Sequence, residues 1–339
     1  MNFKFSIFPT PLTNSGGFTF LNKLKHELKK KKGFVSKWDS ANIVLLNSHH
    51  WIGSLFKIIF LRIKGTKFIL RIDGPLNIYR NTYDSYLLDS LIYSLAINIC
   101  SGIIYQSKWS YLKNIENAKK LRNLSYKIIY NGSDPINILK KRREICLYIA
   151  NSNNLSKGFA TFKKLSEESL KIESLRDLKF YAVGNIPNQK NKLKNINYLG
   201  SLNKKKLSEL MKICKYYIHP SIYEACSNAL IESINHGLIP LVFNGSSNIE
   251  IVKDRRLQFN NVDELLSNLE KIHIGEQFIP KDFEIKKLVI EDSAKEYFKF
   301  FKQIMNEDKR KINLFNLISI IQIFFYYIFR RVFLKVFRF

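Results

Sequence analysis

Short apolar runs of strand length alternate along this chain with longer segments whose apolar residues recur at helical spacing. Uninterrupted apolar runs are typical of strands buried on both faces, as in parallel sheets. Parallel neighbours must be joined by a crossover, usually a helix. The alternation therefore predicts an α/β protein with doubly wound parallel sheets. In the first half, we expect strands at 3–8, 41–46, 67–72, 102–105 and 127–130, with helices at 18–30, 52–61, 85–98 and 109–120.

The chain is long enough for two domains, since 339 residues with 46% hydrophobic content can bury two ordinary cores. The basic run 140–143 separates the two halves and is interpreted as a linker. We predict a first Rossmann-like domain at 1–142, a second at 143–308 and a basic, apolar tail at 309–339. In the second half, we expect strands at 145–150, 180–184, 198–200, 216–218 and 239–243, and helices at 204–212, 262–272 and 283–305.

A strand-to-helix junction in the second half is the strongest candidate ligand site. The apolar strand 216–218 leads through a loop into a helix, and seven residues separate Glu224 from Glu232 across this junction. A helix N-terminus that follows a parallel strand offers unpaired N–H groups and a positive dipole end, which suit a phosphate or pyrophosphate. Carboxylates suit sugar hydroxyls. In the alternative interpretation, Ser221 and Glu224 form a capping box and Glu232 is a solvated helix residue.

The order of segments around this junction resembles the nucleotide-sugar half of glycosyltransferase family 4. That family carries an E-x7-E element, then a Gly-x-Pro-Val-like strand and a Gly-Gly-x-x-Glu-Ile-Val-like turn, and this chain has Glu224 and Glu232, the strand 239–243 and the turn 245–252 in the same order. The resemblance covers most of residues 1–305. It implies a GT-B fold, in which two Rossmann-like domains with parallel sheets face a central cleft, and the last domain helix crosses back to the first domain.

The implied reaction transfers a hexose-like unit from a nucleotide diphosphate sugar to a hydroxyl of a glycan or lipid-linked glycan, with retention of configuration. No metal and no other cofactor is implied. Glu224 would bind the transferred sugar and Glu232 the ribose, while Lys157 and the amides at 225–228 would stabilise the leaving diphosphate. Lys157 matches the family's Lys-Gly element, whereas Asn153 or a neighbour replaces the usual arginine. The donor-binding residues expected are Glu232, Lys157, Ala225, Cys226, Ser227, Asn228, Gly16, Gly17 and Glu250.

The paired glycines Gly16 and Gly17 stand just before the first predicted helix. Glycines let the backbone approach a ligand closely at a helix start, although such a pair also fits an ordinary turn. The resemblance places this loop in the cleft.

Segments that follow strands in the first half resemble those of a surface-polysaccharide branch of the family, which includes lipopolysaccharide synthesis. Ligands of open α/β sheets gather at the carboxyl ends of strands, so we expect Asp73 and Arg71 to face the cleft, with Arg80 as a further anion contact. Together with Glu224, Asp73 and Arg71 are the expected catalytic residues. Asp73 also fits a simple turn before Gly74-Pro75. The matching segments are 71–75, 79–81, 106–107 and 131–134.

One departure from the family lies just before this segment. Many members carry a histidine where Leu70 stands here, so that donor contact cannot be transferred to this chain. His49 and His50 follow the second predicted strand and are the nearby alternatives, although a histidine pair there also fits a purely structural role.

The net charge of +27, from 55 Lys+Arg against 28 Asp+Glu, would ordinarily suggest nucleic acid or an anionic membrane. Lys, Asn and Ile are abundant throughout, as AT-rich coding produces, so the charge alone supports no nucleic-acid partner. Four cysteines without a C-x-x-C pair favour a reducing compartment, and no secretory signal is recognised. We expect a cytoplasmic protein.

The tail contains an uncharged run, 312–329, between the basic groups 309–311 and 330–331. The run barely reaches the roughly 30 Å of a bilayer core, and Asn313, Asn316, Ser319 and Gln322 draw a polar stripe at helical spacing. An in-plane helix on the inner face of the membrane is favoured over a span, and a helix docked on the protein itself is the alternative.

Two other functions remain open. A non-catalytic basic protein that binds membrane or nucleic acid would explain the charge and the tail, but not the context of the two glutamates. Another GT-B enzyme, such as an epimerase or a phosphorylase, would share the fold and differ in its reaction.

Overall fold

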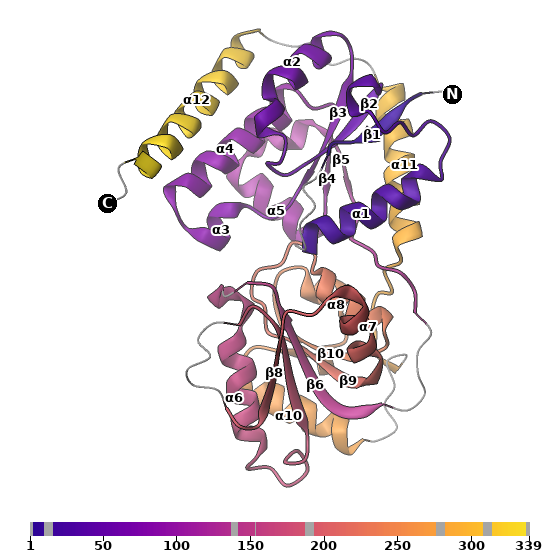
Figure 1. Ribbon diagram of the computed structural model, residues 1–339, viewed down its shortest axis with the longest axis vertical. Helices are drawn as coiled ribbons and strands as arrows, with labels where there is room; N and C mark the ends of the chain where they lie inside the picture. The colour runs from indigo at the N-terminus through magenta and orange to yellow at the C-terminus, as the bar shows by residue number, and fades with distance from the viewer. Residues whose placement is uncertain are drawn as a thin grey trace. The chain divides into compact units, whose positions relative to one another are not determined.

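The computed structural model describes residues 3–9, 16–136, 142–152, 154–186, 193–275, 282–307 and 314–336. The chain divides into two compact units (Figure 1). The first comprises Met1–Leu12, Leu21–Tyr130 and Ser293–Phe339, and the second comprises Thr13–Phe20 and Asn131–Asp292. Predicted features at 14–15, 140–141, 153 and 309–313 lie outside the described residues.

The first unit contains a five-stranded sheet in the order β1-β2-β3-β4-β5, and every pair of neighbours is parallel. This confirms the predicted sheet class. The strands are β1 (Phe5–Ile7), β2 (Ile43–Asn47), β3 (Lys67–Ile72), β4 (Gly102–Tyr105) and β5 (Ser125–Ile128). The helices of this part of the chain are α1 (Gly16–Lys29), α2 (Leu55–Ile63), α3 (Leu76–Arg80), α4 (Tyr83–Asn98) and α5 (Lys108–Asn117), with single 3-10 turns at Trp38–Ser40, Ile52–Ser54 and Lys119–Asn123.

Successive strand residues point to opposite faces of a sheet, and both faces of this one are apolar. On one face, Val44 and Phe68 belong to a buried cluster with residues of α2 and α4. On the other face, Phe5 lies against α11 (Ile290–Asn306), with ring centroids 5.3 Å from Phe298 and 5.7 Å from Phe301. Helices therefore cover both faces, which explains why the strands read as continuous apolar runs.

A buried lysine fastens α11 to this sheet. Lys67 begins β3, and its Nζ donates to the carbonyl oxygens of Ile304 at 2.7 Å, Met305 at 3.2 Å and Glu307 at 2.5 Å. A cation is favourable at a helix C-terminus, where the last carbonyls lack partners within the helix. The ammonium of Lys67 thus ends α11 and holds it on the first unit.

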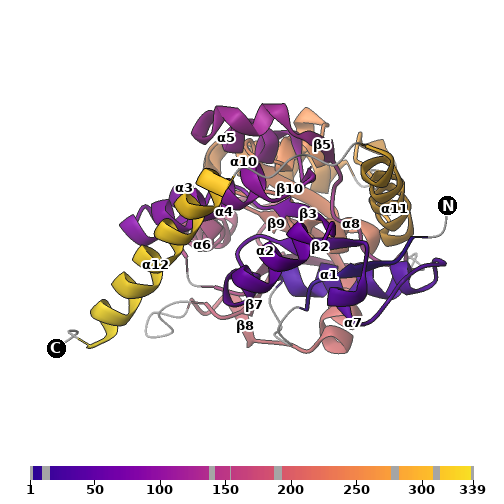
Figure 2. The same ribbon diagram turned by 90° about the horizontal axis from the view of Figure 1, so that it is seen from above.

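The tail forms a helix, α12 (Leu314–Val336), that packs on α4 in both views of the ribbon (Figures 1 and 2). Leu317, Ile320 and Tyr327 are buried in the core of the first unit. Arg330 Nε donates to Asp84 Oδ1 at 2.8 Å, at the start of α4. Of the predicted polar stripe, Ser319 and Gln322 are exposed, but apolar side chains share that exposed face. No helix within the described ranges is both long and apolar enough to cross a membrane.

The second unit contains a six-stranded parallel sheet in the order β11-β10-β9-β6-β7-β8. The order reverses between β6 and β9, as in a Rossmann-type sheet. The strands are β6 (Arg143–Ala150), β7 (Lys179–Gly184), β8 (Ile196–Gly200), β9 (Cys214–His219), β10 (Ile239–Phe243) and β11 (Gln258–Phe259). The helices are α6 (Phe159–Ser169), α7 (Lys204–Ile213), α8 (Asn228–Asn235), α9 (Asn248–Ile251) and α10 (Val262–Ile274), with 3-10 turns at Leu155–Lys157 and Arg255–Leu257.

Two segments differ from the sequence-based expectation for physical reasons. The last domain helix begins at Ile290, not near 283, because Ile285 pairs with Val252 as an isolated antiparallel bridge before the helix starts. Arg142, in the expected linker, is part of the packed unit: its guanidinium donates to the carbonyl oxygens of Met211 at 3.2 Å and Cys214 at 2.6 Å.

Because α12 contributes to the core, Ile320→Ala should destabilise the protein by about 2–5 kcal/mol, through lost burial and the cavity left behind. Ile318→Ala is the matched control, since Ile318 is 52% exposed on the same helix, and its effect should stay within about 0.5 kcal/mol. Denaturant unfolding of both variants measures the difference. Equal effects would mean that α12 does not pack in solution as described.

Candidate functional site

The loops that follow β6, β9 and β10 are tied together at the carboxyl edge of the second sheet. Ser156 accepts from Ile222 N at 2.9 Å through its carbonyl oxygen, which joins the β6 loop to the β9 loop. Asn248 Nδ2 donates to Ser221 O at 2.9 Å, and Ser247 N donates to Glu224 O at 3.2 Å, which joins the β10 loop to them. Ligands of open α/β sheets bind outside the carboxyl ends of strands where the strand order reverses, which here is between β6 and β9.

Gly158 makes the closest of these approaches possible. Its φ of +72° lies in the left-handed region, and a Cβ there would come within 2.4 Å of the carbonyl oxygen of Pro220. Only glycine fits without displacement of the backbone. The carbonyl oxygen of Lys157 also accepts from Tyr148 OH at 3.2 Å. The Lys-Gly pair found in the sequence therefore holds Lys157 against the loop after β9.

Lys157 and Glu224 form an ion pair at this point. Lys157 Nζ lies 2.5 Å from Glu224 Oε1, and Ser221 Oγ donates to the same oxygen at 2.7 Å. The Glu224 side chain is 13% exposed. Burial, the largest single influence, raises the pKa of Glu224, but Lys157, His219 and Ser221 together outweigh it and hold the pKa below its ordinary value. Glu224 is therefore an ionised carboxylate kept largely out of water.

His219 ends β9 beside this pair, and its buried ring meets Tyr217 OH at 3.1 Å through Nδ1. Burial lowers the pKa of His219 to about 4, although Glu224 favours the charged form. The imidazole is thus neutral at neutral pH, and it offers hydrogen bonding without a charge.

The N-terminus of α8 lies in the same group of loops. Ser227 caps the helix, with its Oγ accepting from Leu230 N at 3.3 Å. Asn131 Nδ2 donates to Cys226 O at 3.1 Å and to Asn228 Oδ1 at 3.0 Å, so the Asn-Gly-Ser-Asp segment supports this N-terminus. The buried residues of the junction are Ala225, Cys226 and Ser227.

Glu232 is partly exposed and lies one turn after Asn228, the first residue of α8, which begins directly after the Ser227 cap. Glu250 is partly exposed on α9, after a turn in which Ser246 has a φ of +50°. Within the described ranges, the hydroxyl oxygens of Ser246 and Ser247 are buried without a hydrogen-bond partner. Gly16 and Gly17 form the start of α1; this start, up to Phe20, is grouped with the second unit, and the rest of the helix is grouped with the first.

In the first unit, polar residues gather at the carboxyl ends of β2, β3 and β4. Arg71 is 1% exposed, and its Nη1 lies 2.6 Å from Asn47 Oδ1 and 3.5 Å from Asp73 Oδ1. Gln106 Nε2 donates to the same oxygen of Asp73. The Asp73 side chain is 41% exposed, so a ligand can reach it. Arg71 is buried beneath and is placed to orient Asp73.

The two sequence alternatives, His49 and His50, lie in this group, with ring centroids 4.5 Å apart. Burial lowers the pKa of His49 to about 4, and the neighbouring His50 acts in the same direction, whereas Asp73 opposes both. Burial also lowers the pKa of His50. Both rings are therefore neutral at neutral pH.

Asp89 was not expected from the sequence. Its two carboxylate oxygens accept from Leu76 N and Asn77 N, each at 2.9 Å, and so fix the start of α3, the helix that ends at Arg80. Burial raises the pKa of Asp89 to about 6, against the effect of these two N–H groups. An acidic residue between Leu88 and Leu91 of an apolar helix was the available signal.

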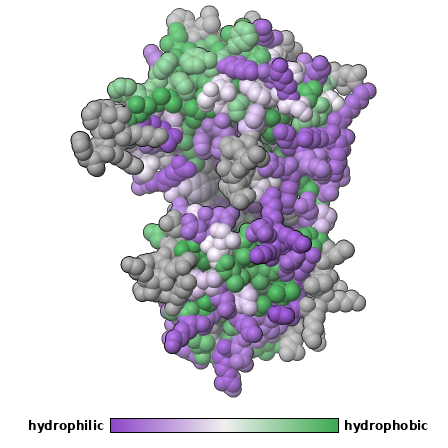
Figure 3. Space-filling view, viewed as in Figure 1, coloured by the Kyte–Doolittle hydropathy of each residue, from purple (hydrophilic) through white to green (hydrophobic). Residues whose placement is uncertain are grey.

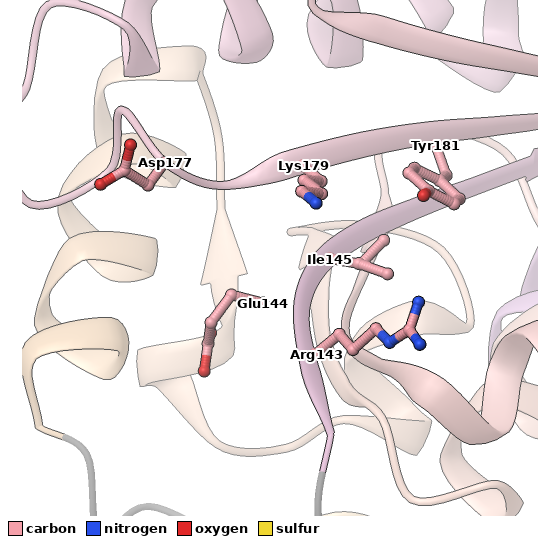
Figure 4. Close-up of a pocket in the computed structure, with 6 residues that line it drawn as sticks. All are labelled: Arg143, Glu144, Ile145, Asp177, Lys179 and Tyr181. Atoms are coloured by element: carbon pink, nitrogen blue, oxygen red, sulfur yellow. The ribbon is translucent and has the colours of Figure 1, made fainter.

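A pocket at the opposite end of β6 and β7 does not share these features. It lies at the amino ends of the two strands (Figure 4). Two cations and two carboxylates line this pocket, so its lining carries no net charge, and Glu144 already pairs with Lys215 at 2.8 Å. The lining residues are Arg143, Glu144, Ile145, Asp177, Lys179 and Tyr181.

Two all-parallel sheets, each covered by helices and the second in Rossmann order, are the architecture of the GT-B glycosyltransferase fold. Alr3699/HepE of Anabaena, solved with UDP and glucose, matches 89% of this chain and 100% of its own at a TM-score of 0.67 and 11% identity. The pneumococcal O-GlcNAc transferase GtfA, solved with UDP and GlcNAc, matches 78% of this chain and 57% of its own at a TM-score of 0.59 and 13% identity. These likenesses establish the fold.

Residues 133–278, within the second unit, match the family model described as "Glycosyl transferases group 1". The capsular polysaccharide biosynthesis glycosyltransferase CapH of Staphylococcus aureus is 26% identical over 240 residues, which are 64% of this chain and 64% of CapH. The chain thus spans less than two thirds of the length of this relative. The matched segment contains Lys157, Glu224 and Glu232.

Substitution of Lys157 should reverse the effect of Glu224 on how the free energy of unfolding depends on pH. In the native protein, the lowered pKa of Glu224 contributes stability above its unfolded pKa, and this contribution is lost as the pH falls through the folded pKa. In Lys157→Met, burial acts unopposed by the lysine and raises the pKa of Glu224. The variant should lose roughly 1–3 kcal/mol at pH 7, and the deficit should narrow towards pH 4.

Unfolding free energies at both pH values measure this effect. Lys164→Met, at an exposed lysine of α6, is the control and should match the native protein at both. A deficit that is the same at pH 7 and pH 4 would refute the coupling to Glu224.

Proposed function

We propose that this protein is a glycosyltransferase that binds a nucleotide diphosphate sugar in its second unit and transfers the sugar to a hydroxyl of a glycan or lipid-linked glycan. The observation that carries the proposal is the meeting of Lys157 and Glu224 beside the N-terminus of α8, where the strand order reverses. This arrangement offers positive charge for a diphosphate and a carboxylate for sugar hydroxyls. The matched family model and the UDP complexes of proteins with the same fold agree with it.

The diphosphate is bound by Lys157 and by the amides at 225–228. As an anion it competes with Glu224 for the ammonium of Lys157, because the two groups need the same cation. Donor binding thereby releases Glu224 Oε1 to accept from hydroxyls of the transferred sugar. Glu232, one turn into α8, binds the ribose. Gly16, Gly17 and Glu250 complete the donor contacts.

Transfer proceeds with retention of configuration and without a metal. Negative charge develops on the leaving diphosphate, and the cation and the helix N-terminus stabilise it there without reorganisation. Glu224 binds and orients, and it does not act as a covalent nucleophile. The leaving phosphate helps to deprotonate the acceptor hydroxyl on the same face.

Asp73 of the first unit contacts the acceptor or the reacting sugar, and Arg71 acts through it. The support is geometric: Gln106 and Arg71 fix one oxygen of the carboxylate, while the side chain remains partly open to solvent. Arg80, at the end of the helix that Asp89 caps, supplies a further anion contact.

The acceptor belongs to surface polysaccharide synthesis, in line with the name of CapH. A lipid-linked acceptor would place the enzyme on the inner face of the cytoplasmic membrane, with the C-terminal tail as its contact. Nucleic acid is not a partner in this proposal.

The two glutamates should separate kinetically. Glu232→Ala should weaken binding of the free nucleotide about tenfold, through lost hydrogen bonds to the ribose. Glu224→Ala should lower turnover by about 100-fold or more without weakening nucleotide affinity, because it removes the carboxylate that competes with the diphosphate for Lys157. A panel of nucleotide sugars including UDP-glucose, with diphosphate release as the readout, measures both. Glu167→Ala, on the exposed face of α6, is the control. Native kinetics in both variants would rule out this site.

Asp73→Asn removes the charge and keeps the shape of the side chain. Transfer to acceptor should fall at least tenfold, because the charge acts on the reacting groups, while nucleotide binding to the second unit stays within about twofold. Asp263→Asn, exposed on α10, should change neither quantity. Native transfer by Asp73→Asn would return Asp73 to the role of a turn residue.

A further inference from the structure

The face of α12 that points away from the core is mostly apolar, although Ser319 and Gln322 are also exposed on it. Ile318, Phe325, Phe329 and Val332 are each more than half exposed. They follow one another at intervals of seven, four and three residues, so they form one stripe along the helix. The opposite stripe, with Leu317, Ile320 and Tyr327, is the one buried in the first unit. The core packing of α12 thus accounts for the buried stripe, and it does not account for the apolar side chains of the exposed one.

Helix α2 presents a second stripe beside it. Phe56, Phe60 and Ile63 are also each more than half exposed, at helical spacing. The Phe56 ring lies 5.8 Å from Phe324 and 6.2 Å from Phe325 between centroids, so the two stripes are continuous. Hydrophobic residues gather over this part of the first unit in the space-filling view (Figure 3). We call the seven exposed residues the docking face: Phe56, Phe60, Ile63, Ile318, Phe325, Phe329 and Val332.

Single exposed apolar residues are common, whereas a contiguous patch marks an interaction surface. The cations around the docking face indicate what it binds. Lys64 Nζ lies 4.4 Å from the centroid of the Phe60 ring, and Lys57, next to Phe56 on α2, is half exposed and pairs with Asp39. Neither α2 nor α12 contains an aspartate or a glutamate. The face therefore combines phenylalanines with a rim of positive charge.

We propose that the first unit docks on an anionic lipid bilayer through this composite face, with α2 and α12 entering the interface together. Phenylalanines insert at the boundary between headgroups and acyl chains, and each cation near an anionic leaflet adds to the attraction. A second copy of the chain fits less well, because it would bring the same cations together. The inference rests on the proposed membrane location and deepens it, since the tail alone is not the membrane contact.

The composite face differs from a free amphipathic tail in one testable way. The inner stripe of α12 stays packed on α4, and Arg330 stays paired with Asp84 at 2.8 Å. The helix therefore carries the first unit down to the bilayer, and α2 must enter with it. Substitutions on α2, more than 250 residues earlier in the chain, should weaken binding as much as substitutions on α12.

The experiment uses the full chain and vesicles of phosphatidylcholine with or without phosphatidylglycerol, with flotation as the readout. The native protein should bind the anionic vesicles and bind the neutral ones weakly. Phe60→Ser with Ile63→Ser on α2, and Phe325→Ser with Phe329→Ser on α12, should each reduce partition onto anionic vesicles about tenfold or more. Leu170→Ser with Ile274→Ser, at exposed apolar residues of the second unit, should stay within about twofold of the native protein.

All substituted side chains are exposed, so thermal midpoints of unfolding should not change, and the α2 variant tests the proposal independently of α12. Native binding by the α2 variant, with binding lost only in the α12 variant, would overturn the composite face in favour of the tail alone. Native binding by both would overturn the docking face altogether. Light scattering that shows a dimer lost in both variants, without vesicle binding by the native protein, would assign the face to a second copy.

Nucleotide-sugar binding, followed as a thermal shift in the same samples, keeps this inference apart from the proposed function. Vesicle binding without any nucleotide-sugar binding would uphold the docking face and overturn the proposed function. Nucleotide-sugar binding with no vesicle binding would overturn the docking face and uphold the donor-binding part of the proposed function.

Discussion

An ammonium and a carboxylate meet at 2.5 Å in the second unit, and the arrangement of three loops depends on this contact. Two charges taken out of water are costly unless they face each other and find further hydrogen bonds, which Ser221 supplies here. The contact requires glycine at 158, since any side chain would meet Pro220. It also requires β6 and β9 to be neighbours, although β7, β8 and α7 separate them in the chain. The strand order, Gly158 and the ion pair therefore depend on one another. Together they fix the position of the loop that leads from β9 into α8.

Much of the fold could be predicted because a strand buried on both faces must be apolar along its whole length, and such runs are visible without knowledge of their neighbours. The sequence indicated candidate-site residues only where a residue is recognised by its own position in the chain, as with Lys157 before Gly158. Asp89 is noticeable as an acidic residue in an apolar helix, but its role could not be recognised, because α3 is a single turn whose start is held by this carboxylate from another helix. The orientation of α12 was equally hidden. Both of its stripes are apolar, so periodicity alone does not tell which one the protein buries.

The two carboxylates proposed to act on the sugar have different surroundings, and this affects what each can do. Glu224 pairs with a lysine and is largely buried, so its charge is balanced in this structure. In the proposed donor complex, the diphosphate takes over the lysine. Asp73 rests on a buried arginine and the Gln106 amide, and one side of it is open. On this proposal, Glu224 suits a role in sugar binding, because the ligand itself frees its carboxylate. Asp73 suits a role in the reaction, because its carboxylate is already oriented and open to solvent.

Lys67 has a further effect on how the molecule is made. This residue near the start of the chain closes the end of α11, and Phe298, Phe301 and Ile304 of that helix cover the sheet face at Phe5 and Gly102. The ribosome produces these residues only after the whole second unit has emerged. Until α11 is synthesised, the apolar surface at Phe5 and Gly102 lacks these side chains, and exposed apolar surface in a nascent domain favours aggregation and the binding of chaperones.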